Sequence, residues 1–197
     1  QAHLTAMKAA GMTPYAVCDV DASRLEVARE EFPGIETYTD LSKMLKQSDV
    51  NLIVHITPHN LHYKLAAQCL RAGKHVVTEK PFVLNTAECD RLIKLADENK
   101  LMLSTYHNRH WDGHIVTAVN KVVEQKVVGD VVAVEAKMGG YGMPKEWWRS
   151  SRSISGGILY DWGCHILEYC LQVIQSDIVE VSGFAVEGFW AERAPKS

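Results

Sequence analysis

Two patterns of apolar and polar residues alternate along the first half of the chain. Short, nearly continuous apolar runs predict buried β-strands, and apolar residues three or four positions apart predict helices. The expected strands are residues 15–20, 50–57, 75–79 and 101–106. The expected helices are residues 1–11, 21–32, 41–47, 60–73 and 85–100. Strands that alternate with helices predict βαβ units around a parallel sheet, a doubly wound α/β domain.

Small polar residues at the helix starts support this division. Their side-chain oxygens can accept hydrogen bonds from the free N–H groups of the first turn. The N-cap candidates are Asp21 or Ser23, Asp40, and Asn85 or Thr86. Gly73 is placed to end the helix that precedes the third expected strand, since glycine readily adopts the left-handed conformation.

The second half has longer and more widely spaced elements. We expect helices at residues 111–129 and 158–174, and a strand at 178–189. Residues 130–142 are expected to form a strand that leads into a glycine-rich loop, and residues 143–157 a long loop. This order predicts a partial α+β domain with an open, mostly antiparallel sheet. The boundary is expected near residue 105, which gives an N-terminal domain of residues 1–105 and a C-terminal domain of residues 106–197.

Composition narrows the class of protein. The chain has 197 residues, of which 47% are hydrophobic and 23% charged, and its formal net charge is -3. This charge gives no sign of a nucleic-acid or anionic-membrane partner. No apolar run reaches the roughly 18 residues of a membrane helix. The five cysteines are scattered, without a CxxC pair, which favours reduced thiols and a cytoplasmic location.

Polar residues that end the expected strands are the first candidates for a binding site, because ligands of open α/β sheets bind beyond the carboxyl ends of the strands. Asp19 is placed to accept hydrogen bonds from a ribose, or else to serve as a turn or helix-cap residue. The segment after the second long strand offers Thr57, Pro58, Asn60 and His62. Its alternative interpretation is a capped turn with a surface histidine, which we favour for His62 taken alone.

Glu79 and Lys80 follow the third of these strands, directly before Pro81. A parallel sheet brings such strand ends to one edge, so Lys80 is expected near Thr57 and Asp19. The proline biases Lys80 toward an extended conformation. The alternative is a surface lysine paired with Glu79, which is what most lysines are.

A last cluster lies in the helix expected at residues 158–174. Asp161 and His165 are four positions apart and share one face if the α-helix is continuous, with Glu168 on nearly the same side. They could be aimed at a substrate, contribute to a metal site, or form a buried pair; no further ligand cluster supports the metal. Nearby glycines favour a close backbone approach, at Gly156, Gly157 and Gly163.

Three segments together resemble the glucose-fructose oxidoreductase/inositol dehydrogenase (Gfo/Idh/MocA) family: "ITPHNLH", "AGKHVVTEKP" and "GGILYDWGCH", in this order. The resemblance covers nearly the whole chain. It implies an N-terminal Rossmann domain, a C-terminal α/β domain with an open sheet, and NAD- or NADP-dependent oxidation or reduction of sugars, inositols and related small molecules.

The resemblance also implies roles for individual residues. Lys80, Asp161 and His165 match catalytic positions of the family. The matched cofactor-binding positions are Asp19, Thr57, Pro58, Asn60, His62, Glu79 and Lys80. The matched substrate-binding positions are Tyr106, Arg109, Trp148 and Arg149.

These positions imply a mechanism and a cofactor. His165 would take the proton of a substrate hydroxyl, Asp161 would orient the hydroxyl or the imidazole, and Lys80 would stabilise the developing negative charge. The Asp19 carboxylate would repel a 2′-phosphate, which favours NAD over NADP, while Arg24 is a weaker signal for NADP. A homodimer or homotetramer is expected, because an open sheet face usually needs a partner.

Two departures and three alternatives accompany this interpretation. The sequence begins inside the helix that follows the family's glycine-rich loop and ends before the second domain is complete, so we expect a piece of a longer protein. The alternatives are an NAD-assisted glycosidase, a ligand-sensing regulator without catalysis, and a zinc-dependent dehydrogenase. The presence of Lys80, Asp161 and His165 argues against the regulator.

Overall fold

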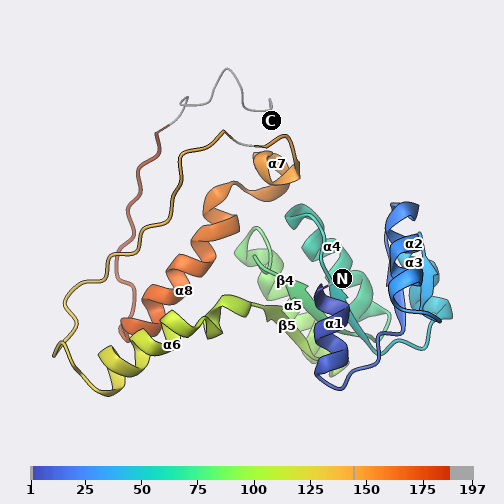
Figure 1. Cartoon of the computed structure of the whole chain (residues 1–197), viewed down its shortest axis with the longest axis horizontal. Helices are drawn as coiled ribbons and strands as arrows, with labels where there is room; N and C mark the ends of the chain where they lie inside the picture. The colour runs from blue at the N-terminus through green and yellow to red at the C-terminus, as the bar shows by residue number, and fades with distance from the viewer. Residues whose placement is uncertain (1, 144, 187–197) are drawn as a thin grey trace.

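The computed structural model describes residues 2–143 and 145–186. Figure 1 shows a central α/β layer, a smaller α/β unit beside it, and a pair of helices on the other side that lead into long extended segments. Among the described residues, no helix has the length and apolar character needed to cross a bilayer.

All strands of the described residues are parallel, as the alternating pattern predicts, but they form two sheets. The strands are Ala16–Cys18 (β1), Glu36–Tyr38 (β2), Leu52–His55 (β3), His75–Glu79 (β4) and Leu103–Tyr106 (β5). β1 pairs with β2, and β4 lies between β3 and β5. The sequence interpretation missed β2, whose three residues carry no apolar run that would mark a strand. Its register is set by pairing with β1 instead.

Helices connect and cover these strands. They are Ala2–Ala9 (α1), Ala22–Glu31 (α2), Leu41–Gln47 (α3), His62–Arg71 (α4) and Thr86–Asn99 (α5). The side chains of Asp21, Asp40 and Asn85 each accept a backbone N–H of the first turn, so these three predicted caps are confirmed. Gly73 follows Ala72, the C-cap of α4, and has a φ of 75°, the left-handed conformation expected where a helix ends.

The main core lies between the three-stranded sheet and the helices α4 and α5. Its fully buried members include Leu70 and Cys69 on α4, Val76 on β4 and Leu92 on α5. Met44 and Leu45 of α3 belong to the same hydrophobic cluster. This packing fixes β3, β4 and β5 relative to one another, and with them the ends at which the candidate site is built.

The second half differs from its expected elements. It contains Gly113–Val119 (α6), Arg152–Ser155 (α7) and Cys164–Val173 (α8). Short 3₁₀ turns lie at His59–Leu61, Asn108–Trp111 and Trp148–Ser150, and π-helical turns at Asn120–Glu124 and Leu159–Gly163. The helix expected at 111–129 therefore ends by residue 125, and the loop expected at 143–157 holds two short helical turns.

The two strands expected in this half are absent from the described residues. Residues 130–142 and 175–186 have no regular secondary structure, and Val132 and Val179 are 98% and 97% exposed. An alternating apolar pattern forms a strand only where another strand offers hydrogen bonds, and no described segment pairs with either one. Residues 187–189 of the second expected strand lie outside the described residues.

Candidate active site

The side chain of Lys80 occupies the centre of the candidate site. It follows β4 directly, is linked to Pro81 by a cis peptide bond, and has a side chain only 15% exposed. Its Nζ atom donates to Oδ1 and to the backbone oxygen of Asp161, both at 2.6 Å. The interpretation of Lys80 as a surface lysine paired with Glu79 is therefore wrong.

Asp161 is placed by the π-helical turn that precedes α8. This turn shows why the assumption of one continuous α-helix is wrong: Asp161 and His165 contact different partners instead of stacking one above the other. Burial would raise the pKa of Asp161, but Lys80, Arg149 and His59 lower that pKa below its usual range. Asp161 is thus an ionised carboxylate that holds the Lys80 ammonium in place.

His165 lies at the start of α8 and is 2% exposed. Its Nδ1 atom is 3.0 Å from Nε2 of His107, which follows β5. Burial, followed by the charge of Lys80, lowers the pKa of His165 to about 4, and burial also lowers the pKa of His107. Both imidazoles are neutral at neutral pH, so one of the two facing nitrogens carries a proton and the other accepts it.

Arg149 and Trp148 close the opposite side of Asp161. The Nε atom of Arg149 is 3.5 Å from Oδ2 of Asp161, and its guanidinium lies 4.2 Å from the centre of the Trp148 ring. Trp148 in turn meets the buried ring of His59 edge-on. The structure therefore brings Arg149 to Asp161, and Trp148 to Arg149 and His59.

His59 was not among the residues expected from the sequence. Its Nδ1 atom donates to the carbonyl of Ser155 at 2.7 Å, which leaves Nε2 as an acceptor. Burial lowers the pKa of His59, so this nitrogen keeps its lone pair. Nε2 is buried, has no hydrogen-bond partner among the described residues, and lies 3.9 Å from Oδ1 of Asp161.

His62 holds two strand ends together. The interpretation as a surface histidine is wrong, because the side chain is fully buried. Its Nδ1 and Nε2 atoms contact the carbonyl oxygens of Pro81 and Thr57 at 2.8 and 3.0 Å. These contacts confirm that Lys80 lies near Thr57. Pro58 precedes the 3₁₀ turn that contains the exposed Asn60.

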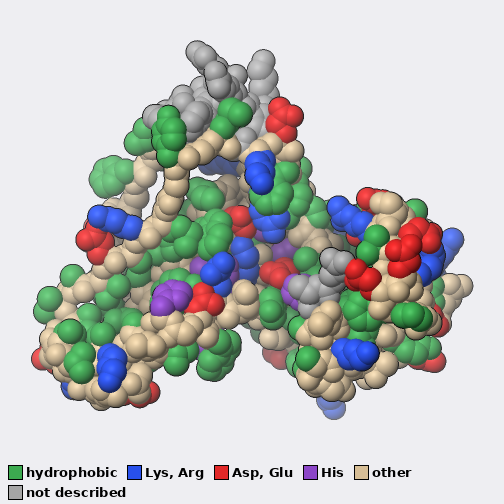
Figure 2. Space-filling model, in the orientation of Figure 1, with side chains coloured by type: hydrophobic (Ala, Val, Ile, Leu, Met, Phe, Trp, Pro, Cys, Tyr) green, Lys and Arg blue, Asp and Glu red, His purple; other side chains and the backbone are tan. Residues whose placement is uncertain are grey.

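The remaining candidates lie around this centre at different distances. Glu79 contacts Nε2 of His3 at 3.0 Å, and the Tyr106 ring meets the ring of the same histidine. The Arg109 guanidinium lies 4.7 Å from the centre of the Trp162 ring, and the Lys80 ammonium lies 5.8 Å from it. The same ring meets the His165 ring edge-on. Figure 2 shows basic, acidic and histidine side chains gathered between the helical and the α/β parts of the molecule.

Asp19 lies at the end of β1, in the other sheet, and no described contact joins it to Lys80 or Thr57. Its Oδ1 atom accepts the N–H of Asp21 at 2.9 Å, and its Oδ2 atom is 3.2 Å from Nη1 of Arg24. This carboxylate and the hydroxyl of Thr57 both lie at carboxyl ends of parallel strands. The Thr57 hydroxyl is buried and has no hydrogen-bond partner within the described part of the chain. These positions fit a dinucleotide that extends along the strand ends.

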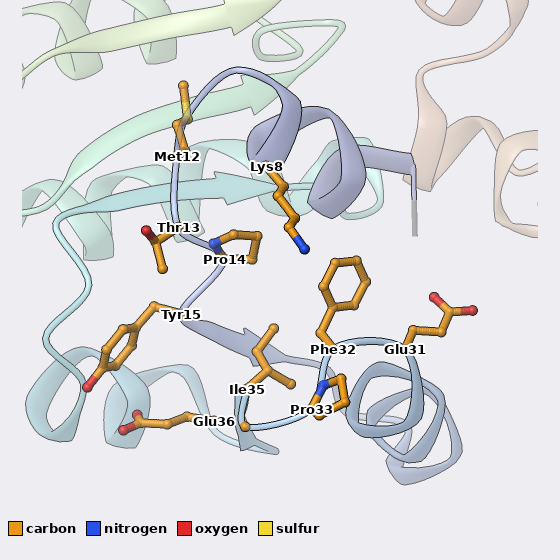
Figure 3. A pocket seen from close by; sticks show the side chains of 11 residues that line it. Lys8, Met12, Thr13, Pro14, Tyr15, Glu31, Phe32, Pro33, Ile35 and Glu36 are labelled. Carbon is orange, nitrogen blue, oxygen red and sulfur yellow. The ribbon is translucent and has the colours of Figure 1, made fainter.

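A hollow of about 500 Å³ lies elsewhere, between α1, β1 and β2. Figure 3 shows its lining, with Lys8 above and Phe32, Pro33 and Ile35 below. Tyr15 and Glu36 belong to this lining and lie at the amino ends of β1 and β2, opposite the end that carries Asp19. None of the candidate catalytic residues contributes to this hollow.

Three residues of the site were not expected from the sequence: His59, His107 and Trp162. His107 contacts a residue 58 positions away, and His59 contacts one 96 positions away. No periodic pattern relates such distant residues. For His107 one signal was available, its position immediately after a strand of the parallel sheet.

Comparison with known proteins gives a consistent result for both halves. Residues 1–107 match the sequence profile of an oxidoreductase family with an NAD-binding Rossmann fold, and residues 116–193 match that of the GFO/IDH/MocA C-terminal domain.

Individual relatives are known from several bacteria. The scyllo-inositol 2-dehydrogenase (NADP(+)) IolW of Bacillus subtilis is 32% identical over 160 residues, which cover 81% of this chain and 44% of the relative. The myo-inositol 2-dehydrogenase of Thermotoga maritima is 27% identical, with coverage of 85% and 49%. The crystal structure of an NAD-binding protein from Listeria innocua superposes with a TM-score of 0.81 at 29% identity, covering 89% of this chain and 51% of that one. The chain thus spans about half the length of the relatives it matches.

Proposed function

Because the chain belongs to the Gfo/Idh/MocA oxidoreductase family, we propose that the full-length protein oxidises or reduces a sugar, polyol or related small molecule with a nicotinamide cofactor. The observation that carries the proposal is the junction of Lys80 with Asp161 at 2.6 Å, beside the His165–His107 pair. These groups supply a cation, a carboxylate and a neutral imidazole at one place. The names of the two inositol dehydrogenases among the relatives support this substrate class.

Lys80 would stabilise negative charge on the reacting oxygen. Two of its three N–H groups point to Asp161, and the third is available to a substrate oxygen. In the oxidative direction this oxygen gains negative charge as its proton leaves, and a fixed ammonium in a half-buried site stabilises that charge strongly. The two hydrogen bonds to Asp161 keep the Lys80 ammonium in position.

His165 would accept the hydroxyl proton at Nε2. Its Nδ1 atom donates to Nε2 of His107 when His107 carries its own proton on Nδ1. This arrangement leaves the Nε2 lone pair of His165 free, with no described hydrogen-bond partner. As the proton reaches Nε2, the Nδ1 proton can pass to His107, which lies within the field of the Glu168 carboxylate. A nicotinamide held along the strand ends would supply the acceptor for the hydride that leaves the carbon bearing this hydroxyl.

A single-turnover experiment on the full-length protein tests this assignment. Lys80→Ala and His165→Ala should each lower the rate of hydride transfer by roughly 100-fold or more. Lys94→Ala is a matched control, because Lys94 is an exposed residue of α5 that pairs with Glu98. Near-normal rates in both site variants would overturn the mechanism.

We propose NAD as the preferred cofactor, with Asp19 as the discriminating residue. Its carboxylate would bind the ribose hydroxyls and repel a 2′-phosphate. Arg24 beside it supplies an opposing charge, and one relative is named as NADP-dependent. The ratio of kcat/KM for NAD to that for NADP should be well above one and should fall in Asp19→Ser. Equal efficiency with both cofactors would contradict the proposal.

We also propose a cytoplasmic homodimer or homotetramer. The exposed side chains of Val132, Val179 and Phe184 are the apolar surface that a second copy would cover, and the five cysteines are free. Light scattering of the full-length protein should give a mass of two or four chains, and cell fractionation should recover it with the cytoplasm. A monomeric mass would contradict the first half of this proposal.

A further inference from the structure

Three metal-binding side chains converge next to the proposed base. The ligand atoms of His107, Cys164 and His165 all lie within 4.8 Å of one another. His107 comes from the end of β5, while Cys164 and His165 are the first two residues of α8. No metal-binding motif with regular spacing marks this cluster in the sequence, because Cys164 and His165 are adjacent and His107 is 58 positions away from His165.

The distance between the two imidazole nitrogens is close to that at a tetrahedral metal. Two imidazole nitrogens bonded to one Zn²⁺ lie about 3.3 Å apart, given bonds of about 2.0–2.1 Å at the tetrahedral angle. Nδ1 of His165 and Nε2 of His107 are 3.0 Å apart. One thiolate and two imidazoles suit Zn²⁺, Co²⁺ and related thiophilic cations, and a fourth position remains for water.

The charges around the cluster permit a cation. Lys80 is matched by Asp161 at 2.6 Å, and Arg109 is matched by Asp112 at 3.1 Å. Glu168 lies one turn after His165 on α8, and its Oε2 atom is buried without a hydrogen-bond partner among the residues described. This carboxylate adds negative potential on the side of His107.

We propose that His107, Cys164 and His165 form a binding site for a thiophilic divalent cation of the Zn²⁺ type, and that the bound cation inhibits hydride transfer. The inhibitory half rests on the proposed function. A cation on Nδ1 of a neutral imidazole leaves the ring proton on Nε2. His165 would then have no lone pair to accept the substrate proton.

Binding of the cation would release one proton from the site. The thiol of Cys164 loses its proton to solvent and gives up a weak contact with the backbone oxygen of Asp161 at 3.7 Å. The proton shared between His165 and His107 moves to an outer nitrogen of one ring. One proton is therefore released for each cation bound, without any redox change.

Spectroscopic titration of the full-length protein with Co²⁺ tests the site independently of activity. One equivalent should produce a thiolate-to-cobalt charge-transfer band together with ligand-field bands of tetrahedral intensity. Cys164→Ser should abolish the charge-transfer band, and His107→Gln should weaken binding by at least roughly 100-fold, more than loss of an outer partner costs. Cys89→Ser on α5 is the control and should leave the spectrum unchanged. A missing band in the unaltered protein, or a band that persists in Cys164→Ser, would overturn the site.

Inhibition is tested with Zn²⁺ in single-turnover hydride transfer. Zn²⁺ should stop turnover of the unaltered protein, a chelator should restore it, and Cys164→Ser should require at least roughly 100-fold more Zn²⁺. Cobalt binding without any effect of Zn²⁺ on the rate, or activation by Zn²⁺, would overturn the inhibitory half. Absence of hydride transfer with every polyol and sugar would count against the proposed function, while the cobalt spectrum would still decide the metal site.

Discussion

The sheet β3–β4–β5 and the segment at residues 175–186 contain similar β-branched and aromatic residues but end in different states. In the sheet, Val76 pairs with Leu103 and Ile53 across parallel ladders and is fully buried. In the segment, Phe184 is 102% exposed and no strand forms. The difference shows that β-propensity gives a strand only where the chain supplies a partner. These two elements represent two regions of the chain, residues 1–106 and the described residues from 107 to 186, and the candidate site draws on both: Lys80 belongs to the first, and Asp161 and His165 belong to the second.

The largest expected effect concerns stability in the paired region. Leu70→Ala on α4 removes a fully buried side chain from the main core and should lower the free energy of unfolding by about 2–5 kcal/mol. Phe184→Ala is the matched control and should change it by less than about 0.5 kcal/mol, because the ring makes no buried contact. Urea denaturation of both variants measures the contrast. A comparable loss in Phe184→Ala would show that the segment is packed in solution.

The second effect concerns the contact that joins the two regions. In the full-length protein, Asp161→Asn keeps the size of the side chain but removes the charge that faces Lys80, and it should lower the hydride-transfer rate by about 100-fold. Asp90→Asn on the exposed face of α5 serves as the control and should have no effect. An unchanged hydride-transfer rate in Asp161→Asn would mean that the contact between Lys80 and Asp161 serves the structure and not the reaction.

These two regions also differ in how much the sequence could predict. Asp21, Asp40 and Asn85 were predicted as caps because capping depends on neighbours two or three positions away. The contact of Lys80 with Asp161 spans 81 positions, and local patterns carry no information about it. Only the family resemblance placed both residues in one site.

Neither the local sequence patterns nor the family resemblance predicted some other parts of the site. His107 belongs to the site through its contact with His165, and Trp162 through its contacts with Lys80 and Arg109. The π-helical turn at Leu159–Gly163 could not be read from an apolar pattern with helical spacing. It is nevertheless what directs Asp161 and His165 to different partners, and such turns are frequent at functional sites.

The third effect is a pH dependence of stability that belongs to the paired region. His55 on β3 is buried, has no hydrogen bond to either ring nitrogen among the described residues, and burial lowers its pKa to about 3. The unfolded chain therefore binds a proton that the folded chain does not between this pH and the ordinary pKa. The contribution of the neutral His55 to the free energy of unfolding is fully present above about pH 6.5, and it is lost as the pH falls toward 3.

His55→Phe tests this contribution, since a ring of similar size cannot be protonated. Between pH 7 and pH 5 the unaltered chain should lose about 2 kcal/mol of stability through His55, and His55→Phe should not. The control is His114→Gln, an exposed residue of α6 that should leave the slope unchanged. Equal slopes in His55→Phe and the unaltered chain would contradict a neutral, buried His55.

The smallest expected effect lies at the helix starts. Asn85 accepts the N–H of Glu88 at 2.9 Å, whereas Ser151, at the start of α7 in the other region, makes no capping hydrogen bond. Asn85→Ala should therefore lower the free energy of unfolding by about 1 kcal/mol, and Ser151→Ala by less than about 0.5 kcal/mol. Thermal and urea unfolding of both variants measure this contrast. A larger loss in Ser151→Ala would mean that α7 contributes to folding as strongly as the capped helices do, and the distinction between the two regions would then rest on the missing strand partners alone.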